Sequence, residues 1–389
     1  MTYKIQTRNS ISSKGLERLP ASLFEILGDE AEAPDGILVR SANMLQEELP
    51  SSLLAIARAG AGTNNIPIDR CSAQGIAVFN TPGANANAVK ELVLGALVLA
   101  GRDIAGALAW CAGLKDEGDA VPALVEKGKG RFAGEELYGK TIGVIGLGAI
   151  GVKVANTATL LGMEVLGYDP YISVDVAWSL SRHVKHCVNF GDLLQNSDFI
   201  TLHLPVTKDT KGIIGASALQ QMKPSARVLN FARGELVDTA AMLDALKNGR
   251  LARYITDFPT GELIGKPGVV CIPHLGASTP ESEDNCAVMA AKQLKDYLLN
   301  GNIENSVNLP SLSMPRSGAS RLCVLHRNVK GLLGALTGAL GDAGINIDNL
   351  SNKSMGEYAY TMLDFSPTPE DTVVQRIAAL EDVIRVRLV

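Results

Sequence analysis

The stretch Thr141–Gly151 reads TIGVIGLGAIG and joins a short apolar run to three glycines in G-x-G-x-x-G spacing. An apolar run bounded by glycines is typical of a buried strand, and the residues after Gly151 keep apolar side chains at helical spacing. A strand, a glycine turn and a helix in this order form the context in which the motif binds a dinucleotide. The sequence therefore predicts a Rossmann unit with Gly146, Gly148 and Gly151 beside the pyrophosphate.

A carboxylate at the end of the next predicted strand indicates which dinucleotide is bound. Glu164–Tyr168 reads as that strand, and Asp169 follows it eighteen residues after Gly151. A carboxylate there accepts hydrogen bonds from both ribose hydroxyls and repels a 2′-phosphate, so NAD is favoured over NADP. The alternative is an ordinary glycine turn, but the two flanking strands and the acid favour nucleotide binding.

Composition bounds the class of protein. The 389 residues suggest two or three domains, and 46% hydrophobic with 20% charged residues is typical of a globular protein with a large core. A net charge of −5 without a long basic run argues against nucleic-acid or acidic-lipid partners. The six cysteines lack C-x-x-C spacing, which argues against a disulfide framework or a zinc site, and no metal is expected.

The sequence gives no sign of a signal peptide or of a membrane span. Met1–Ser10 is polar, unlike a signal peptide, and the longest strongly apolar run, Leu92–Ala100, is too short to span a bilayer. We therefore expect a cytoplasmic protein.

Two arginines before the glycine motif follow predicted strands directly. Gly36–Val39, Leu53–Ala57 and Ile76–Phe79 each read as a strand that ends in a small, polar or basic loop. This repetition predicts a parallel α/β sheet with functional loops at the strand C-termini. Arg40 and Arg58 would there suit a phosphate or carboxylate, which a guanidinium grips with a planar fork. The alternative is that both are solvated surface arginines.

Strand and helix alternate again after Asp169, which predicts a second, doubly wound parallel sheet. The expected strands are Phe199–His203, Arg227–Asn230, Ala252–Thr256 and Val269–Ile272. The expected long helices are Asn85–Arg102 and Glu281–Asn300. Between the first of these helices and the glycine motif, residues 103–138 suggest an arm that packs on another subunit.

The last seventy residues or so predict a separate unit of βαββαβ order, the ferredoxin-like pattern. Its expected elements are Arg321–His326, Val329–Ala343, Ile345–Asn352, Tyr358–Phe365, Pro369–Leu380 and Val383–Leu388. The Pro- and Ser-rich stretch Asn308–Ala319 before it reads as a linker. A unit this small is marginally stable alone, so pairing with a second copy is plausible.

His274 is the candidate acid/base of the chain. It alone among five histidines follows an apolar strand and precedes a loop of small residues, Gly276–Thr279. Glu262 could pair with it and raise the pKa of His274, while Arg233 at another strand end calls for an anion. The alternative for His274 is a structural histidine with satisfied hydrogen bonds.

Several segments resemble the D-isomer-specific 2-hydroxyacid dehydrogenases, and the fit covers roughly residues 35–310. They are VIGLGAIG at 144–151, NFARG at 230–234, residues 257–262 and PHLGAST at 273–279. VRSA at 39–42, RAGAGTNNI at 58–66 and NTPGANANAVKELVLG at 80–95 most resemble the members that oxidise 3-phospho-D-glycerate to 3-phosphohydroxypyruvate, the first step of L-serine biosynthesis. The C-terminal unit resembles the ACT domain of many such enzymes.

The resemblance implies a role for each matching position. Arg233 would bind the substrate carboxylate and 2-oxygen, His274 would be the acid/base, and Glu262 its partner. NAD would be bound by Gly146, Gly148, Ala149, Ile150, Gly151, Asp169, Leu204, Pro205, Phe231, Ala232, Asp257, Gly276 and Ala277. The substrate phosphate and carboxylate would be held by Arg40, Ser41, Arg58, Gly60, Ala61 and Gly62. L-serine, as a possible effector, would be bound by His326, Asn328 and Asn346.

The expected architecture is α/β, with a flavodoxin-like substrate domain, a Rossmann NAD domain and a ferredoxin-like ACT domain. We assign residues 1–90 plus 281–308 to the substrate domain, 91–280 to the NAD domain, 309–319 to the linker and 320–389 to the ACT domain. The expected partners are 3-phosphoglycerate and further copies of the chain in a dimer or tetramer. Two alternatives stay open: an enzyme for another 2-hydroxy acid, such as glyoxylate or hydroxypyruvate, and a non-catalytic NAD-dependent sensor.

Overall fold

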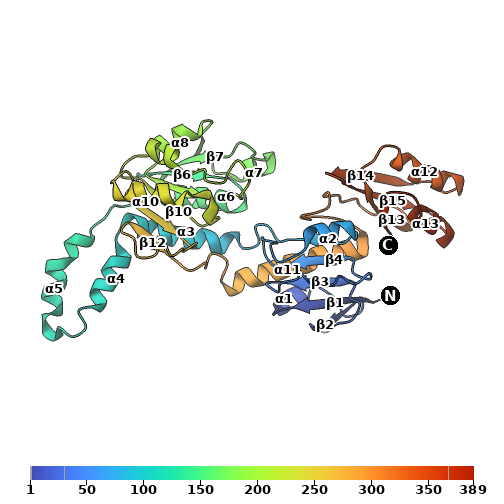
Figure 1. The fold of residues 1–389 in the computed structure, drawn as a ribbon, viewed down its shortest axis with the longest axis horizontal. Helices are drawn as coiled ribbons and strands as arrows, with labels where there is room; N and C mark the ends of the chain where they lie inside the picture. Colours follow the sequence, from blue (N-terminus) through green and yellow to red (C-terminus); the bar gives the residue numbers. More distant parts are fainter. Residues whose placement is uncertain (1, 30, 367) are drawn as a thin grey trace. The chain divides into compact units, whose positions relative to one another are not determined.

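The computed structural model describes residues 2–29, 31–366 and 368–389, and the chain forms two compact units. One consists of Met1–Ala84 and Pro280–Val389, and the other of Asn85–Thr279. Two sheets lie in the first unit and one in the second (Figure 1). The predicted fold class, two parallel-sheet α/β parts and a small antiparallel one, is confirmed.

The N-terminal sheet of the first unit is parallel, with strand order β2-β1-β3-β4-β5. Its strands are β1 (Tyr3–Arg8), β2 (Phe24–Leu27), β3 (Gly36–Val39), β4 (Ala55–Arg58) and β5 (Ala77–Phe79), with short helices α1 (Ser13–Leu16) and α2 (Ile68–Ala73). Leu38 and Ala57 face the cluster of the long helix α11 (Pro280–Asn300), while Ile37 and Ile56 pack on the opposite face. This alternation buries both faces of the sheet, as in flavodoxin-like folds.

The sheet of the second unit is also parallel, with order β12-β11-β10-β9-β6-β7-β8. Its strands are β6 (Thr141–Ile145), β7 (Glu164–Tyr168), β8 (Val184–His186), β9 (Phe199–Leu202), β10 (Arg227–Asn230), β11 (Arg253–Thr256) and β12 (Val269–Cys271). Its helices are α3 (Ala86–Gly101), α6 (Ala149–Leu160), α7 (Val174–Ser179), α8 (Phe190–Asn196), α9 (Ala216–Gln221) and α10 (Thr239–Lys247). Phe199 packs with α3 and α6 and Ile200 with α8 and α9, so helices cover both faces.

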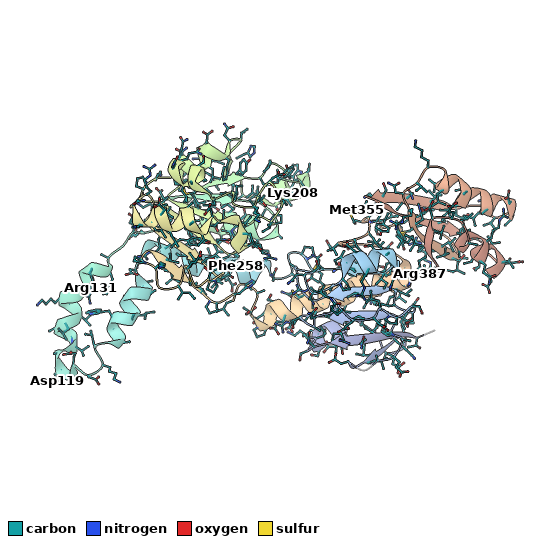
Figure 2. The ribbon with its side chains drawn as sticks, viewed as in Figure 1. Asp119, Arg131, Lys208, Phe258, Met355 and Arg387 are labelled. Atoms are coloured by element: carbon teal, nitrogen blue, oxygen red, sulfur yellow. The ribbon has the colours of Figure 1, made fainter. Side chains whose placement is uncertain are left out.

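An arm of two helices, α4 (Ile104–Ala112) and α5 (Val121–Gly128), extends from this unit, with Asp119 at its far end (Figures 1 and 2). Neither helix has a buried residue, although α4 is almost wholly apolar. In the described part of the chain, no single helix meets the length and hydropathy required to cross a bilayer; α3 and α4, bent by 75°, meet them only when joined.

The C-terminal sheet is antiparallel, with order β14-β15-β13-β16. Its elements are β13 (Ser320–Arg327), α12 (Leu332–Asp342), β14 (Asn349–Met355), β15 (Tyr358–Phe365), α13 (Asp371–Ala378) and β16 (Val383–Leu388). This is the predicted βαββαβ order, with shifted bounds: the first helix begins at Leu332 and not at Val329, and the second strand ends at Met355 and not at Asn352. The second strand begins at Asn349 and not at Ile345, because Ile345 and Ile347 still pack on the helix side of the core.

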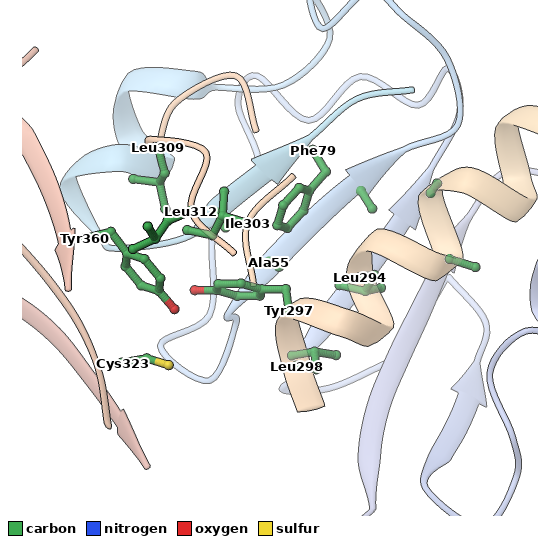
Figure 3. Packing of buried hydrophobic residues seen from close by; sticks show 14 of the residues in the cluster. Ala55, Phe79, Leu294, Tyr297, Leu298, Ile303, Leu309, Leu312, Cys323 and Tyr360 are labelled. Atoms are coloured by element: carbon green, nitrogen blue, oxygen red, sulfur yellow. The ribbon is translucent and has the colours of Figure 1, made fainter. Parts of the chain in front are cut away.

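The stretch between α11 and the C-terminal sheet is packed and not a loose tether. Leu309, Leu312 and Met314 are almost wholly buried in a cluster that also contains Tyr297 of α11 and Tyr360 of β15 (Figure 3). Arginines of this region cap the last carbonyls of α11: Arg387 donates to Leu298 O at 2.8 Å and Arg321 to Asn300 O at 2.9 Å (Figure 2 labels Arg387). The C-terminal sheet is thus fixed to the end of α11.

Candidate active site

The glycine loop of the second unit has the geometry that a dinucleotide requires. Gly146 has φ +89°, and a Cβ added at Gly151 would lie 1.9 Å from the Gly146 carbonyl oxygen. Only glycine permits this approach of α6 to β6. At Gly148, in contrast, a Cβ would meet nothing within 4 Å, so the loop is open where α6 begins and where Ala149 and Ile150 form its first turn. The residues fit a pyrophosphate at the helix N-terminus.

Asp169 follows β7 and shapes this loop. One carboxylate oxygen accepts a hydrogen bond from the Leu147 N–H at 2.9 Å, and the other accepts from the Tyr171 N–H at 2.9 Å. The Asp169 carboxylate therefore fixes the glycine loop while standing at the strand end where a ribose is expected.

His203 lies beneath the same loop and was not among the predicted site residues. Its Nε2 lies 3.0 Å from the Thr201 hydroxyl, and burial lowers the pKa of His203 to about 3. The ring is therefore neutral at physiological pH and adds no charge next to the expected pyrophosphate. In the sequence, His203 reads as the last residue of the predicted strand Phe199–His203, and this position at a strand end was the available signal.

The other predicted cofactor residues all follow strands of this one sheet. Because its neighbouring strands are parallel, their C-terminal ends lie along one edge. The residues at this edge are Leu204 and Pro205 after β9, Phe231 and Ala232 after β10, Asp257 after β11, and Gly276 and Ala277 after β12.

A cavity of about 570 Å³ opens at this edge and contains His274. Asp257, Phe258 and Leu263 are among its lining residues. The His274 ring contacts Phe258 in a tilted arrangement, with the ring centroids 4.8 Å and the ring planes 52° apart (Phe258 is labelled in Figure 2). The sequence did not single out Phe258, although an aromatic residue directly after Asp257 was a signal available to it.

Asp257 is the buried carboxyl group of this cavity, with 1% of its surface exposed. Burial raises the pKa of Asp257, while the positive charges of His274 and Arg233 act in the opposite direction. Within the described residues its Oδ1 has no hydrogen-bond partner. A buried carboxyl oxygen without a donor fits the carboxamide N–H of a nicotinamide ring.

Arg233 is exposed in a loop whose backbone is held by Asn230. The Asn230 side chain donates to the Arg233 carbonyl at 2.9 Å and accepts from the Ala232 N–H at 3.2 Å. The Arg233 guanidinium itself donates to the Ala232 carbonyl. Asn230 was not among the predicted site residues; a buried amide at a strand end was the signal for it.

Glu262 is exposed and does not line the cavity. The described residues show no hydrogen bond or ion pair that joins it to His274. Its role as the partner of His274 stays a prediction.

In the first unit, the predicted anion-binding residues lie together at the C-terminal ends of β3 and β4. Arg58 Nε donates to the Arg40 carbonyl at 3.2 Å, and Val39 and Arg58 are register partners. A Cβ added at Gly60 would lie 2.4 Å from the Arg58 guanidinium, so the loop that runs on through Ala61 and Gly62 passes close to it.

The residues after β3 make contacts with distant parts of the unit. The Ser41 N–H donates to the Asn9 side chain at 3.0 Å. Arg40 pairs with Glu283 of α11 at 2.5 Å, a contact that the sequence did not predict.

The three predicted effector residues differ in burial. His326 is 3% exposed, and its nitrogens lie 2.8 Å from the Arg327 carbonyl and 2.8 Å from the Thr361 hydroxyl. Burial lowers the pKa of His326. Asn328 and Asn346 are exposed. An effector could therefore reach the two asparagines directly, whereas His326 already has partners within its own sheet.

Comparison with known families assigns two parts of the chain. Residues 104–276 match the family model of the D-isomer-specific 2-hydroxyacid dehydrogenase NAD-binding domain, and residues 321–383 match the ACT domain.

The described residues hold no group of three or more His, Cys, Asp or Glu side chains placed to bind a metal ion.

Similar curated proteins include three named D-3-phosphoglycerate dehydrogenase. The Methanocaldococcus jannaschii protein is 37% identical over 76% of this chain, the Bacillus subtilis protein 31% over 80%, and the Saccharomyces cerevisiae protein, named D-3-phosphoglycerate dehydrogenase 2, 31% over 86%. The matches span 55%, 60% and 73% of those proteins, so the chain covers little more than half the length of the first.

Solved structures agree with the fold. The NAD⁺-bound 3-phosphoglycerate dehydrogenase of Entamoeba histolytica is 27% identical, with a TM-score of 0.58 over 80% of this chain and all of that one. Apo D-mandelate dehydrogenase of Rhodotorula graminis, 22% identical, shares the fold with a TM-score of 0.67 over 81% of this chain and all of that one. NAD is the cofactor of the Rossmann domain. On these matches, the chain belongs to the D-isomer-specific 2-hydroxyacid dehydrogenases.

Proposed function

We propose that the protein oxidises 3-phospho-D-glycerate to 3-phosphohydroxypyruvate with NAD, the entry reaction of L-serine biosynthesis. The observation that carries the proposal is the surroundings of Asp257. The acid/base candidate His274 lines the same cavity as Asp257, and so does Gly234, the neighbour of the carboxylate-binding candidate Arg233. A non-catalytic sensor would have no need of such a set. The names of the relatives support the substrate.

The roles of the side chains follow from their chemistry. NAD, when bound, supplies the acceptor for the hydride that leaves C2 of the substrate. His274 Nε2 or Nδ1 takes the proton of the 2-hydroxyl group, and the Arg233 guanidinium holds the substrate carboxylate in a planar fork. Glu262 stabilises the protonated His274, and Asp257 holds the nicotinamide carboxamide. Arg40 and Arg58 bind the phosphate.

Replacing Arg40 or Arg58 by alanine is expected to raise KM for 3-phosphoglycerate at least tenfold, because each removes a charge-assisted contact worth about 1.5–3 kcal/mol. KM for NAD and the kinetics with unphosphorylated D-glycerate should stay unchanged. Initial rates of NADH formation at 340 nm measure both. Exposed Arg18 of the same unit provides the matched control, Arg18→Ala. An unchanged KM in both variants, or faster turnover of glyoxylate or hydroxypyruvate by the wild type, would instead support the alternative substrates.

We further propose that the protein is a homo-oligomer. The support is the arm: α4 is apolar along most of its length, yet Leu108 is 67% exposed and no residue of α4 or α5 is buried. An apolar helix without a covering surface is typical of a subunit interface.

We also propose that the ACT domain binds a small-molecule effector, L-serine, at the predicted residues His326, Asn328 and Asn346. The domain is fixed to the last turn of α11, while the first turn of α11 carries Glu283, which pairs with Arg40. An effector that moved the domain would therefore act on the helix that contacts the proposed phosphate site.

Light scattering on the purified protein tests the proposed oligomer. The mass should be at least twice 41.0 kDa, the mass of one chain. A monomeric mass would contradict the proposal.

Thermal unfolding with and without L-serine tests the proposed effector site. L-serine should raise the melting temperature of the wild type, and Asn346→Ala should abolish that shift. An unshifted melting temperature of the wild type would contradict the proposal.

A further inference from the structure

The ion pair between Arg40 and Glu283 places a carboxylate where the proposed function places an anion. Arg40 Nη2 lies 2.5 Å from Glu283 Oε1, and both side chains are 41% exposed. While the pair persists, the Nη2 N–H that points to the Glu283 oxygen is withheld from other acceptors, so a phosphate that takes this N–H must displace that oxygen.

The first turn of α11 is held in place by other contacts, so Glu283 cannot simply swing away with the helix. Asp284, the next residue, pairs with Lys14 at 2.6 Å and accepts a hydrogen bond from the Ser12 hydroxyl at 2.5 Å. Gly15 of α1 packs so closely on Ala287 that an added Cβ would lie 2.6 Å from the Ala287 Cβ. Glu283 therefore stands on a fixed backbone, and only its side chain can yield.

The next turn of α11 also faces the arginines. Burial raises the pKa of the Cys286 thiol, while Arg58 and Arg40 act in the opposite direction. Both guanidinium groups are thus near this end of the helix, where the Glu283 carboxylate pairs with one of them. That carboxylate cancels half of the positive charge offered to a phosphate.

We propose that Glu283 sets the affinity and charge selectivity of the Arg40–Arg58 site by competing with the substrate phosphate for Arg40. This rests on the proposed function, since it assumes that the phosphate binds there. An intact carboxylate weakens the binding of every anion, and it weakens that of a phosphate dianion more than that of a singly charged group. Glu283 is therefore a specificity-determining residue and not a catalytic one.

Glu283→Gln tests the proposal, since it keeps the shape of the side chain and removes its charge. We expect KM for 3-phosphoglycerate to fall about tenfold, equivalent to about 1.4 kcal/mol, and inhibition by inorganic phosphate to strengthen by a similar factor. kcat and KM for NAD should not change. Exposed Glu281, two residues earlier on the same helix, gives the matched control Glu281→Gln, for which neither KM should change.

A double-mutant cycle separates competition from a general effect of charge. In the Arg40→Ala background, Glu283→Gln should improve KM by less than twofold, because the shared partner is gone. Melting temperatures of all variants check folding, and calorimetric titration with inorganic phosphate measures the site without turnover.

The outcomes distinguish the competition proposal from the phosphate assignment on which it rests. If Arg40→Ala leaves KM and phosphate binding unchanged, the phosphate assignment of the proposed function fails. If Arg40→Ala weakens both but Glu283→Gln leaves KM unchanged or raises it, only the competition proposal is overturned; a raised KM would mean that Glu283 orients Arg40 for binding.

Discussion

His274→Ala is expected to lower kcat for 3-phosphoglycerate oxidation by a factor of about 10²–10⁴, the usual contribution of a positioned acid/base. NAD should bind to this variant as it does to the wild type, because the glycine loop and Asp169 are held by contacts that do not involve His274. Initial rates of NADH formation measure kcat, and calorimetric titration with NAD measures the affinity for the cofactor.

Arg233→Ala should show a comparable loss by a different route. It removes the planar fork that orients the substrate carboxylate, so kcat/KM for the oxidation should fall while NAD affinity is retained. His183→Ala is the matched control for His274→Ala and should leave the kinetics unchanged. His183 is an exposed histidine of the same unit and lies far along the chain from the cavity loops. Near-normal turnover in both the His274 and the Arg233 variants would leave the acid/base assignment without support.

The parts of the fold that depend on neighbours in the sequence were predictable. The glycine loop, β6, β7 and Asp169 lie within thirty residues or so, and the spacing of the glycines reflects one steric requirement, the approach of α6 to β6. β1 and β2 escaped prediction because YKIQTR mixes polar with apolar residues and FEIL has two exposed positions at the edge of its sheet.

The contacts that determine the site were harder to predict because they join distant positions. Arg40 and Glu283 are 243 residues apart, and each reads as an ordinary charged residue in its own segment. The ring contact of Phe258 with His274 and the two hydrogen bonds of Asn230 depend on how loops fold back at the strand ends. Spacing along a chain carries no information about such side-chain pairing.

The interior of the C-terminal sheet contains a charge pair with a large expected effect on stability. Arg321 of β13 and Asp364 of β15 are wholly buried, and their side chains meet at 2.6 Å and 2.9 Å. Asp364 also accepts from the Ser317 N–H at 2.9 Å, and Arg321 donates to the carbonyls of Asn300 and Pro315. The pair thereby joins the two strands, the packed connecting stretch and the end of α11.

Asp364→Asn is expected to lower the free energy of unfolding of the C-terminal domain by about 3–5 kcal/mol, because it leaves the Arg321 charge buried without a counter-charge. Urea unfolding followed by circular dichroism measures the change. Glu357→Gln breaks the exposed pair between Arg327 and Glu357 in the same domain and should cost about 0–1 kcal/mol. Equal losses in the two variants would contradict the difference that burial is expected to make.

The same pair should make stability depend on pH in acid. The hydrogen bonds from Arg321 and Ser317 outweigh burial and hold the pKa of Asp364 below its ordinary value, and Asp364 raises that of Arg321. The unfolded chain therefore takes up this proton at a higher pH than the folded chain does. The stabilisation is complete above the unfolded pKa of about 3.9 and is lost as the pH falls through the lower folded pKa. From pH 7 down to about pH 4 the stability curves of the wild type and of Asp364→Asn, whose amide does not titrate, should run parallel. Below that pH the wild type should lose stability relative to the variant; curves that stay parallel there would show that Asp364 is not the titrating group.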